Sequence, residues 1–365
     1  MKNFDLANLA VQMICPNNLV KVDDTGYPSV LVYIPAFKNS EVLVNGDNNL
    51  HPAFIVNGEA IPGFYYSKYQ NVEYDGVAYS LPDKEPALSP GTVNNVSVYC
   101  EAKGAGWHLS TAAEWAAIAL WCKKNGFLPY GNNDYRKDKR ETNYKARPAF
   151  VSGGELSSRT ATGTGPVTWS HDNTVAGIWD MNGNVWERQG GIRLVWGELQ
   201  VLANNDAADS KNSQDMRSTC WKAINAATGA LVEPEDWPDN GEIITTGNTV
   251  RIDYKDGKWC YSKNITISAH SVANCDFGSL YCDATISEAA KMVLRALALL
   301  PDEDDTDNKQ IVTMGNTYGM MYMLRGGDYT TQSSAGINAM KFVNGMNNEY
   351  VDLGFRSAYI PELDK

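Results

Sequence analysis

The stretch GIWDMNGNVWE, residues 177–187, decides how the chain is expected to fold. Its centre, Asn182-Gly183-Asn184, is a turn signal, because glycine accepts a positive φ and asparagine tolerates one. The large apolar pair Val185-Trp186 follows at once, so we expect the chain to leave the turn directly into a buried strand. Glu187 comes next, and a buried carboxylate needs a cationic partner. Arg356, close to the C-terminus, is the partner that we expect, and this pair would hold the last strand against the middle of the chain.

The clearest helix is expected over residues 111–126. Thr111 and Glu114 form the S/T-x-x-E pattern of a capping box at its start, and Gly126 supplies a stop at its end. Its apolar face consists of Trp115, Ile118, Ala119 and Cys122.

Other elements are expected along the chain. A short helix near residues 5–14 has Leu6, Leu9, Ala10 and Met13 on one face and stops at Cys15-Pro16. Residues 29–34 are a buried strand, and Asn57-Gly58 and Asp75-Gly76 are hairpin turns. A second clear helix starts at Ser287 and ends at Pro301. Residues 130–165 are expected to be long loops, and residues 198–285 short strands with turns.

Composition excludes several classes of function. The chain has 365 residues and a formal net charge of −12, which argues against a nucleic-acid partner, since phosphate binding needs clustered Lys and Arg. No apolar window of 18 residues exists, so no membrane insertion is expected, and the N-terminus lacks the pattern of a signal peptide. The chain is therefore expected to be made in a cytoplasm. Its 7 cysteines are scattered without a CxxC pair and are expected to be reduced thiols.

Four blocks in a fixed order carry a family resemblance. They are GWHLSTAAEW (106–115), GIWDMNGNVWE (177–187), LRGG (324–327) and GFR (354–356). Together they resemble the formylglycine-generating-enzyme (sulfatase-modifying factor) type of the C-type lectin fold. The resemblance implies an α+β fold that is irregular and loop-rich, with two or three helices and short antiparallel strands.

The enzymes of that family are one reading of the resemblance. They resemble cysteine-based oxidases with thiols in the C-terminal third, or oxygenases with several His ligands. Here no cysteine follows Cys282, and the four histidines have no paired spacing. We therefore expect no enzymatic activity and no catalytic residue. A formylglycine-type oxidoreductase, or a purely structural virion or surface protein, remains the alternative.

The non-catalytic reading is favoured. Residues 325–356 resemble, in place and length, the C-terminal variable region of proteins diversified by retroelements, such as phage major tropism determinants. The resemblance implies a ligand-binding protein, either a phage or prophage receptor-binding protein associated with the tail or a variable protein on a cell surface. Its partner would be a protein or glycan receptor on a cell surface, and homo-oligomers would supply avidity.

The ligand-binding side chains follow from the resemblance by position. They are Asp328, Tyr329, Thr330, Gln332, Ser334, Lys341, Val343, Asn344, Asn348, Tyr350 and Asp352. The spacing of 328, 330, 332 and 334 predicts one face of an extended segment. The interleaved apolar residues Ala335, Ala339, Phe342, Leu353 and Phe355 are expected to be buried and to hold the segment stiffly.

The expected layout has an N-terminal attachment or oligomerisation segment (1–50) and a lectin-like domain (51–365). That domain contains an insertion at about 195–285 and the variable region 325–356. No cofactor is expected, although structural calcium is compatible with loops such as Asn204-Asn205-Asp206 and Trp237-Pro238-Asp239-Asn240. The acidic run at 302–307 is expected to be a solvated loop.

Overall fold

The computed structural model describes residues 3–88, 93–141, 143–241, 243–266, 272–344 and 352–364. The described residues form α1 (Asn3–Ile14), α2 (Asn39–Val42), α3 (Val93–Glu101), α4 (Ala112–Asn125) and α5 (Glu288–Ala296). Single 3-10 turns are η1 (Pro52–Phe54), η2 (Val167–Trp169), η3 (Asp206–Ala208), η4 (Phe277–Ser279), η5 (Gln332–Ser334) and η6 (Pro361–Leu363). Many strands join these helices, so the class is α+β as predicted, with more helices than expected.

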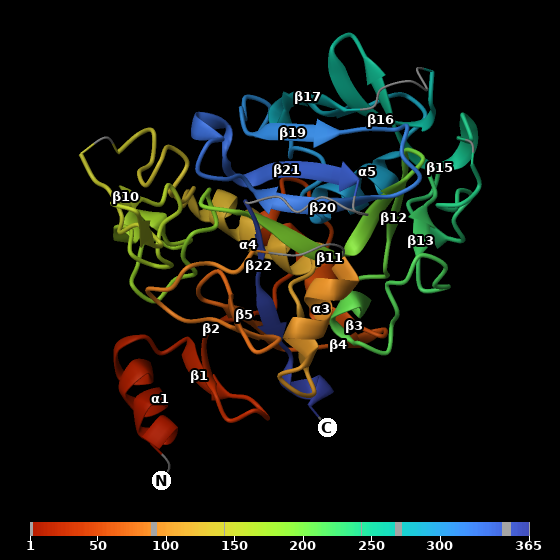
Figure 1. Cartoon of the computed structure of the whole chain (residues 1–365). Coiled ribbons are helices and arrows are strands. Elements are labelled where there is room, and N and C mark those ends of the chain that lie inside the picture. Colours follow the sequence, from red (N-terminus) through yellow and green to blue (C-terminus); the bar gives the residue numbers. More distant parts are fainter. Residues whose placement is uncertain are drawn as a thin grey trace.

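Helix α4 lies between the two larger sheets of the molecule (Figure 1). Its predicted capping box is confirmed: the Glu114 N–H donates to the Thr111 hydroxyl at 3.1 Å, and the Thr111 N–H donates to the Glu114 carboxylate at 3.1 Å. Gly126 ends the helix in the left-handed region with φ 73°. Small alanines around most of its circumference let both sheets approach, so nearly the whole helix is buried.

The smaller sheet joins both ends of the chain. Its strands, in spatial order, are β1 (Asn18–Val22), β2 (Pro28–Pro35), β5 (Gly63–Ser67), β23 (Ser357–Tyr359) and β8 (Trp107–Leu109). The strand predicted at 29–34 is thus confirmed as part of β2. The predicted boundary at residue 50 is wrong as a structural division, because β1 and β2 share this sheet with the last strand.

The larger sheet has twelve described strands. Its main path is β17 (Ala273–Asp276), β19 (Ile311–Met314), β21 (Gly336–Asn344), β20 (Met321–Gly326), β11 (Trp186–Val195), β12 (Glu198–Val201), β15 (Thr246–Lys255), β16 (Lys258–Asn264) and β18 (Tyr281–Cys282). Beside it lie β13 (Lys222–Ile224), β14 (Leu231–Val232) and β22 (Leu353–Phe355). The segment expected as an insertion at 195–285 supplies β12 to β18, so it extends the main sheet and is no separate unit.

Three hairpins complete the strands: β3 (Ile55–Val56) with β4 (Glu59–Ala60), β6 (Val72–Tyr74) with β7 (Val77–Tyr79), and β9 (Val151–Ser152) with β10 (Glu155–Leu156). The first two contain the predicted Asn57-Gly58 and Asp75-Gly76 turns. All four turn residues have positive φ, as a type I′ turn requires. The third lies within the stretch predicted as loops.

Helix α1 forms where it was predicted and stops before Cys15-Pro16. Its apolar side chains Leu6, Leu9 and Met13 are exposed. Figure 1 shows α1 and β1 at the opposite end of the molecule from β17, β19 and β21. No helix among the described residues is long and apolar enough to cross a bilayer.

Helix α5 starts as predicted but ends earlier. Ser287 caps it by accepting the Ala290 N–H at 3.2 Å. The helix ends at Ala296, before the predicted Pro301, because Ala298 turns into the left-handed region with φ 49°.

Loss of the α5 cap gives a first testable prediction. Replacing Ser287 by Ala leaves the Ala290 N–H without its acceptor, so the free energy of unfolding is expected to fall by about 1 kcal/mol. Urea denaturation measures this change. The matched variant Ser287→Asp keeps an acceptor at the cap and should stay close to wild type, and an equal loss in both variants would contradict the assigned cap.

Candidate ligand-binding face

Strand β21 has two different sides. Met340 and Phe342 point into the main core beside α4, whereas Ala339 and Val343 belong to a second apolar cluster on the other side. Lys341 alternates with Met340 and Phe342, so it lies on this second side. The second cluster also contains Trp186 at the start of β11. The sequence motif that decides the fold therefore supplies the floor beneath the predicted binding region.

The first end of this region is held by Arg325. Its guanidinium is fully buried and donates to the carbonyl oxygens of Leu297 (3.2 Å) and Ala298 (2.9 Å), just past the end of α5. These are carbonyls that a helix end leaves without partners. Burial lowers the pKa of Arg325 to about 10, which leaves it charged at neutral pH.

Two glycines follow Arg325 in a closely packed turn. Gly326 and Gly327 have φ 96° and 85°, and a Cβ on Gly327 would lie 2.7 Å from the Cβ of Ala335. The Gly326 carbonyl accepts the N–H of Gly183 at 3.0 Å, which ties the turn to the Asn182-Gly183-Asn184 motif. A side chain at either glycine would push this turn away from its support.

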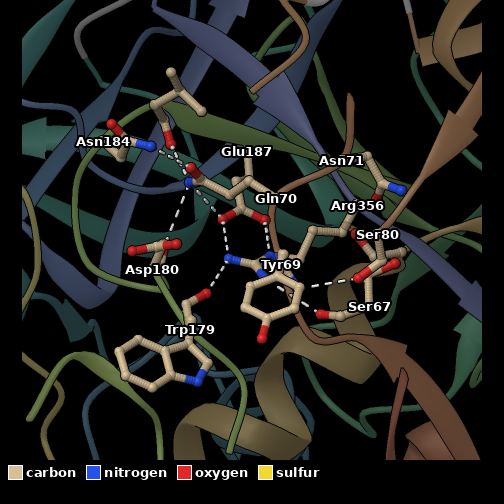
Figure 2. A network of polar contacts seen from close by, with 12 residues as sticks. Ser67, Tyr69, Gln70, Asn71, Ser80, Trp179, Asp180, Asn184, Glu187 and Arg356 are labelled. Carbon is tan, nitrogen blue, oxygen red and sulfur yellow. Dashed lines mark hydrogen bonds and ion pairs between the residues drawn. The ribbon is translucent and has the colours of Figure 1, made fainter. Parts of the chain in front are cut away.

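The second end is held by Arg356, and the predicted pair with Glu187 is confirmed (Figure 2). The Arg356 Nε donates to Glu187 Oε2 at 2.7 Å, and Nη2 donates to Oε1 at 2.9 Å. The remaining guanidinium hydrogens bind the carbonyl oxygens of Ser67, Lys68 and Trp179 at 2.6–3.2 Å. Burial by itself would lower the pKa of Arg356, but the Glu187 carboxylate raises it.

A network that the sequence did not reveal surrounds this pair (Figure 2). The Gln70 amide donates to Glu187 Oε1 at 3.0 Å, and its oxygen accepts from Asn184 Nδ2 at 2.8 Å. Burial raises the pKa of the neighbouring Asp180 to about 6, although the Gly163 N–H donates to it at 2.7 Å. The turn at 182–184, the strand β11 and the C-terminal arginine are therefore one hydrogen-bonded unit.

Asp328 was predicted to face outward, and this prediction is wrong, because its side chain is only 5% exposed. Its Oδ1 accepts from the Thr330 N–H (2.7 Å) and hydroxyl (2.7 Å) and from the Thr331 hydroxyl (2.9 Å). Its Oδ2 accepts from the Trp186 indole at 3.1 Å. Asp328 thus shapes the turn after Arg325-Gly326-Gly327 and does not face solvent.

The predicted extended face over residues 328–334 is also wrong. The chain makes a turn after Asp328 and then the 3-10 turn η5, so the period of two does not apply. Thr330 and Gln332 are nevertheless exposed, and Tyr329 and Ser334 are partly exposed. The sequence signal that was missed is an Asp with threonines two and three positions later, which favours a side-chain-capped turn.

A second loop packs against this turn. The Tyr135 N–H donates to the Tyr329 carbonyl at 3.0 Å, and the Gln332 N–H donates to the Asn133 carbonyl at 2.8 Å. The rings of Tyr135 and Tyr329 meet edge to face with centroids 5.8 Å apart. Tyr135 is 50% exposed and was not among the predicted binding residues. Nothing in the sequence links residue 135 to residue 329.

Lys341 and Val343 differ in their exposure. The Lys341 ammonium lies 5.9 Å from the centre of the Trp186 ring and is partly exposed. Val343 was predicted to face outward, but it is 5% exposed and packs with Trp186, Leu324 and Leu353. This is a second correction: apolar burial on both sides of the sheet outweighs the positional analogy.

The predicted buried set is confirmed. Ala335, Ala339, Phe342, Leu353 and Phe355 are all at most 5% exposed. The side chain of Asn344, and Asn348 and Tyr350 as a whole, lie outside the described residues.

Asp352, partly exposed, forms an acidic pair with Asp328. Burial, together with the hydrogen bond to Asp328 and its charge, raises the pKa of Asp352 to about 6. Burial would also raise the pKa of Asp328, but hydrogen bonds from Asp352 and Thr330 hold it below its ordinary value. Below about pH 6, the protonated carboxyl of Asp352 therefore donates to the carboxylate of Asp328, beside the Trp186 indole.

This pair makes a pH-dependent prediction. The folded-state pKa of Asp352 is raised, so its contribution to stability is fully present below about pH 4 and is lost as the pH rises through about 6. Asp352→Asn should leave the free energy of unfolding unchanged at pH 4 and raise it by about 1 kcal/mol at pH 8, after allowance for solvent screening. Denaturation at both pH values measures the difference. A variant that gains nothing at pH 8 would contradict the shared proton.

Among the thiols and imidazoles of the described residues, Cys100, Cys122, His51, His108 and His171 are buried. Burial raises the pKa of Cys100 and Cys122, which disfavours the nucleophilic thiolate form. Burial also lowers the pKa of His51 and His171 to about 4, so both are neutral. His108 is hydrogen-bonded to Glu114 at 2.8 Å and packs below the start of α4. His270 lies outside the described residues.

The loops considered for calcium are occupied by protein contacts. Asn205 is buried and accepts the Thr111 hydroxyl, and Asp206 accepts the Asn57 N–H. Asp239 forms an ion pair with Arg217. Asp302, from the acidic run expected to be solvated, is buried and pairs with Lys123 at 2.9 Å. Over the described ranges, no three His, Cys, Asp or Glu side chains gather as a metal site.

Comparisons with known proteins give distant likenesses only. No family model matches the chain, and no curated protein matches it. Among solved structures, the chain is similar to the Major Tropism Determinant U1 variant, with 12% identity and a TM-score of 0.30. It is also similar to the P3c variant (11%, 0.30) and the M1 variant (11%, 0.29). Each likeness covers 94% of this chain and 71% of the other.

Proposed function

We propose that the chain is a non-catalytic ligand-binding protein with a C-type lectin fold of the formylglycine-generating-enzyme type. It binds its partner through a surface that we call the C-terminal face. This surface consists of Tyr135, Tyr329, Thr330, Gln332, Ser334 and Lys341. The four sequence blocks support the fold assignment, because Glu187 of one block and Arg356 of another form the buried pair that joins them.

The observation that carries the proposal is a stiff frame beneath exposed side chains. Arg325 and Arg356 fix the two ends of the segment in buried sites, and Trp186 supports its middle. On this frame sit aromatic, amide, hydroxyl and ammonium groups that are partly or fully exposed. Aromatic anchors beside adaptable polar groups are typical of binding surfaces, and a frame that is already ordered lowers the entropy lost on binding.

The partner that we propose is a protein or glycan receptor on a cell surface. The C-terminal region resembles retroelement-diversified variable proteins, which supports a place on a phage or prophage tail or on a cell surface. In that role α1 attaches or oligomerises the protein, and several copies supply avidity. The exposed apolar side chains of α1, at the end of the molecule away from β21, are compatible with this role (Figure 1).

Binding to whole cells tests the proposal. Fluorescently labelled protein is titrated onto a panel of bacterial strains, and saturable binding is measured by flow cytometry. The double variant Tyr135→Ala/Tyr329→Ala should bind a positive strain at least tenfold more weakly, because each exposed aromatic anchor at a binding surface contributes about 1 kcal/mol or more.

A matched control removes two tyrosines elsewhere. Tyr27, between β1 and β2, and Tyr74, at the end of β6, are 63% and 50% exposed and lie outside the C-terminal face, so Tyr27→Ala/Tyr74→Ala should bind like wild type. Both double variants should unfold at similar denaturant concentrations. If the control loses binding as strongly as the test variant, or the test variant keeps full affinity, the C-terminal face is not the binding surface.

A further inference from the structure

A second concave site lies on a different side of α4 from β21. A cavity of about 530 Å³ opens between β2, α2, α4 and the loop at 171–176. Ile118, Trp121 and Asn125 follow one stripe of α4 into it, whereas Trp115 faces β21 and donates its indole N–H to the Ile337 carbonyl at 2.7 Å. The cavity is therefore separate from the C-terminal face.

The cavity has an apolar floor and aromatic walls. Val32, Ile34, Val42 and Ile118 form a buried floor, and the partly exposed rings of Tyr33, Phe37 and Trp121 stand around it. The ring of Trp121 is packed in place between His171 (5.3 Å) and Phe127 (5.9 Å). The volume of the cavity falls within the roughly 300–1,000 Å³ typical of small-molecule pockets.

The imidazole of His171 is a polar group at the cavity, and one of its two ring nitrogens already has a hydrogen-bond partner. His171 lines the cavity and is 6% exposed. Its Nδ1 accepts the Ile178 N–H at 2.8 Å, so the neutral ring carries its hydrogen on Nε2. No hydrogen bond to another described residue engages this Nε2, and the His171 ring lines the cavity. A nearly buried donor of this kind favours a ligand that brings an acceptor.

The charged groups at the rim do not demand a charged ligand. Asp172 is engaged by the Thr174 N–H and hydroxyl at 2.9–3.0 Å and by the Ser170 hydroxyl at 3.2 Å. Glu41 accepts the Lys38 N–H at 2.7 Å, and Lys124 on the same rim opposes both carboxylates in charge. The buried part of the lining offers apolar side chains and the His171 imidazole, with partly exposed aromatic rings around them.

We propose that this cavity binds a neutral, planar aromatic molecule of about two fused rings, with a ring acceptor that takes the hydrogen bond of His171 Nε2. The rings lie against Trp121 and the apolar floor, and the acceptor reaches the imidazole. The site is independent of the C-terminal face and of the partner proposed for it.

Two isosteric probes test the site. Quinoline and naphthalene have the same shape, but only quinoline carries a ring nitrogen, which is neutral at pH 7.5. Saturation-transfer NMR and calorimetry should show both bound to the whole protein. Quinoline should bind more tightly by roughly threefold to tenfold, as expected for one hydrogen bond.

Two variants and one control separate the role of the cavity from the role of His171. Ala36→Trp places an indole at a partly buried position on the cavity wall and should weaken both probes at least tenfold. The control Val151→Trp adds the same group at a position that is 61% exposed in the β9–β10 hairpin, and it should change nothing. His171→Phe keeps a ring beside Trp121 and should remove the preference for quinoline.

Three outcomes would overturn the inference. No binding of either probe at millimolar concentration, or binding that survives Ala36→Trp, would show that the cavity is not a site. Equal affinity for quinoline and naphthalene in the wild type would remove the role of His171, and this result needs no variant to fold.

Discussion

Replacing Arg356 by methionine is expected to lower the free energy of unfolding by about 3–5 kcal/mol, because it leaves the buried Glu187 carboxylate without its counter-charge. The carbonyl oxygens of Ser67, Lys68 and Trp179 lose their donor in the same step. Guanidinium chloride denaturation of the full chain measures the change. This pair joins β22, β11 and the smaller sheet, so the loss should appear as one cooperative shift of the whole transition.

The double variant Arg356→Met/Glu187→Met is the matched control. Removing both charges relieves the unpaired carboxylate, so part of the lost stability should return. The single variant Glu187→Met should be destabilised to a similar degree as Arg356→Met. If Arg356→Met costs less than about 1 kcal/mol, the two ends of the C-terminal segment are not held by this pair.

Replacing Trp186 by alanine is expected to cost about 3–5 kcal/mol, since it opens a cavity beneath the C-terminal face. Trp186 is 4% exposed and packs with Leu324, Val343 and Leu353. It also donates its indole N–H to Asp328 Oδ2 at 3.1 Å, so the variant leaves one oxygen of a buried carboxylate with fewer donors. Thermal and chemical denaturation measure this loss.

The variant Trp186→Phe separates packing from the hydrogen bond. It keeps a ring in the cluster and removes only the indole N–H, so we expect a loss of about 1–2 kcal/mol. Cell binding should weaken with Trp186→Ala even under conditions where the variant stays folded, because the turn at Asp328 loses its support. Full affinity in folded Trp186→Ala protein would argue that the face does not depend on this frame.

The sequence was most informative where the local chemistry admits few solutions. The capping box of Thr111 and Glu114 is a short-range pattern, and it formed as predicted. The Glu187–Arg356 pair lies 169 residues apart, yet it was predicted because both residues belong to recognised motif blocks. Gln70, which completes the same network, carries no pattern of its own and could not be found without the fold.

Helix α3 shows a different limit. Its sequence contains β-branched residues and asparagines, which are weak helix formers, and no helix was predicted there. Val96 and Cys100 lie one turn apart and pack together with Leu109 and Phe355, so tertiary burial outweighs propensity.

The buried residues of the candidate site were predicted correctly, but several of its outward-facing residues were not. The buried set and the Glu187–Arg356 pair at the second end agree with the structure, because they follow from burial and from the motifs. The outward set was carried over by position, and positional analogy cannot tell that Asp328 turns inward to four donors or that Val343 is covered. Tyr135 joined the face through a backbone contact with Tyr329, which only the folded chain reveals.

Photo-crosslinking from Gln332 tests the central claim most directly. Gln332 is exposed on the C-terminal face, so benzoylphenylalanine at this position should lie within reach of a bound receptor. The same group at Val151, which is also exposed, serves as the control. On a bacterial strain that the wild type binds saturably, we predict a covalent product with a cell-surface component from position 332 and none from position 151. A product from position 151 alone would contradict the account.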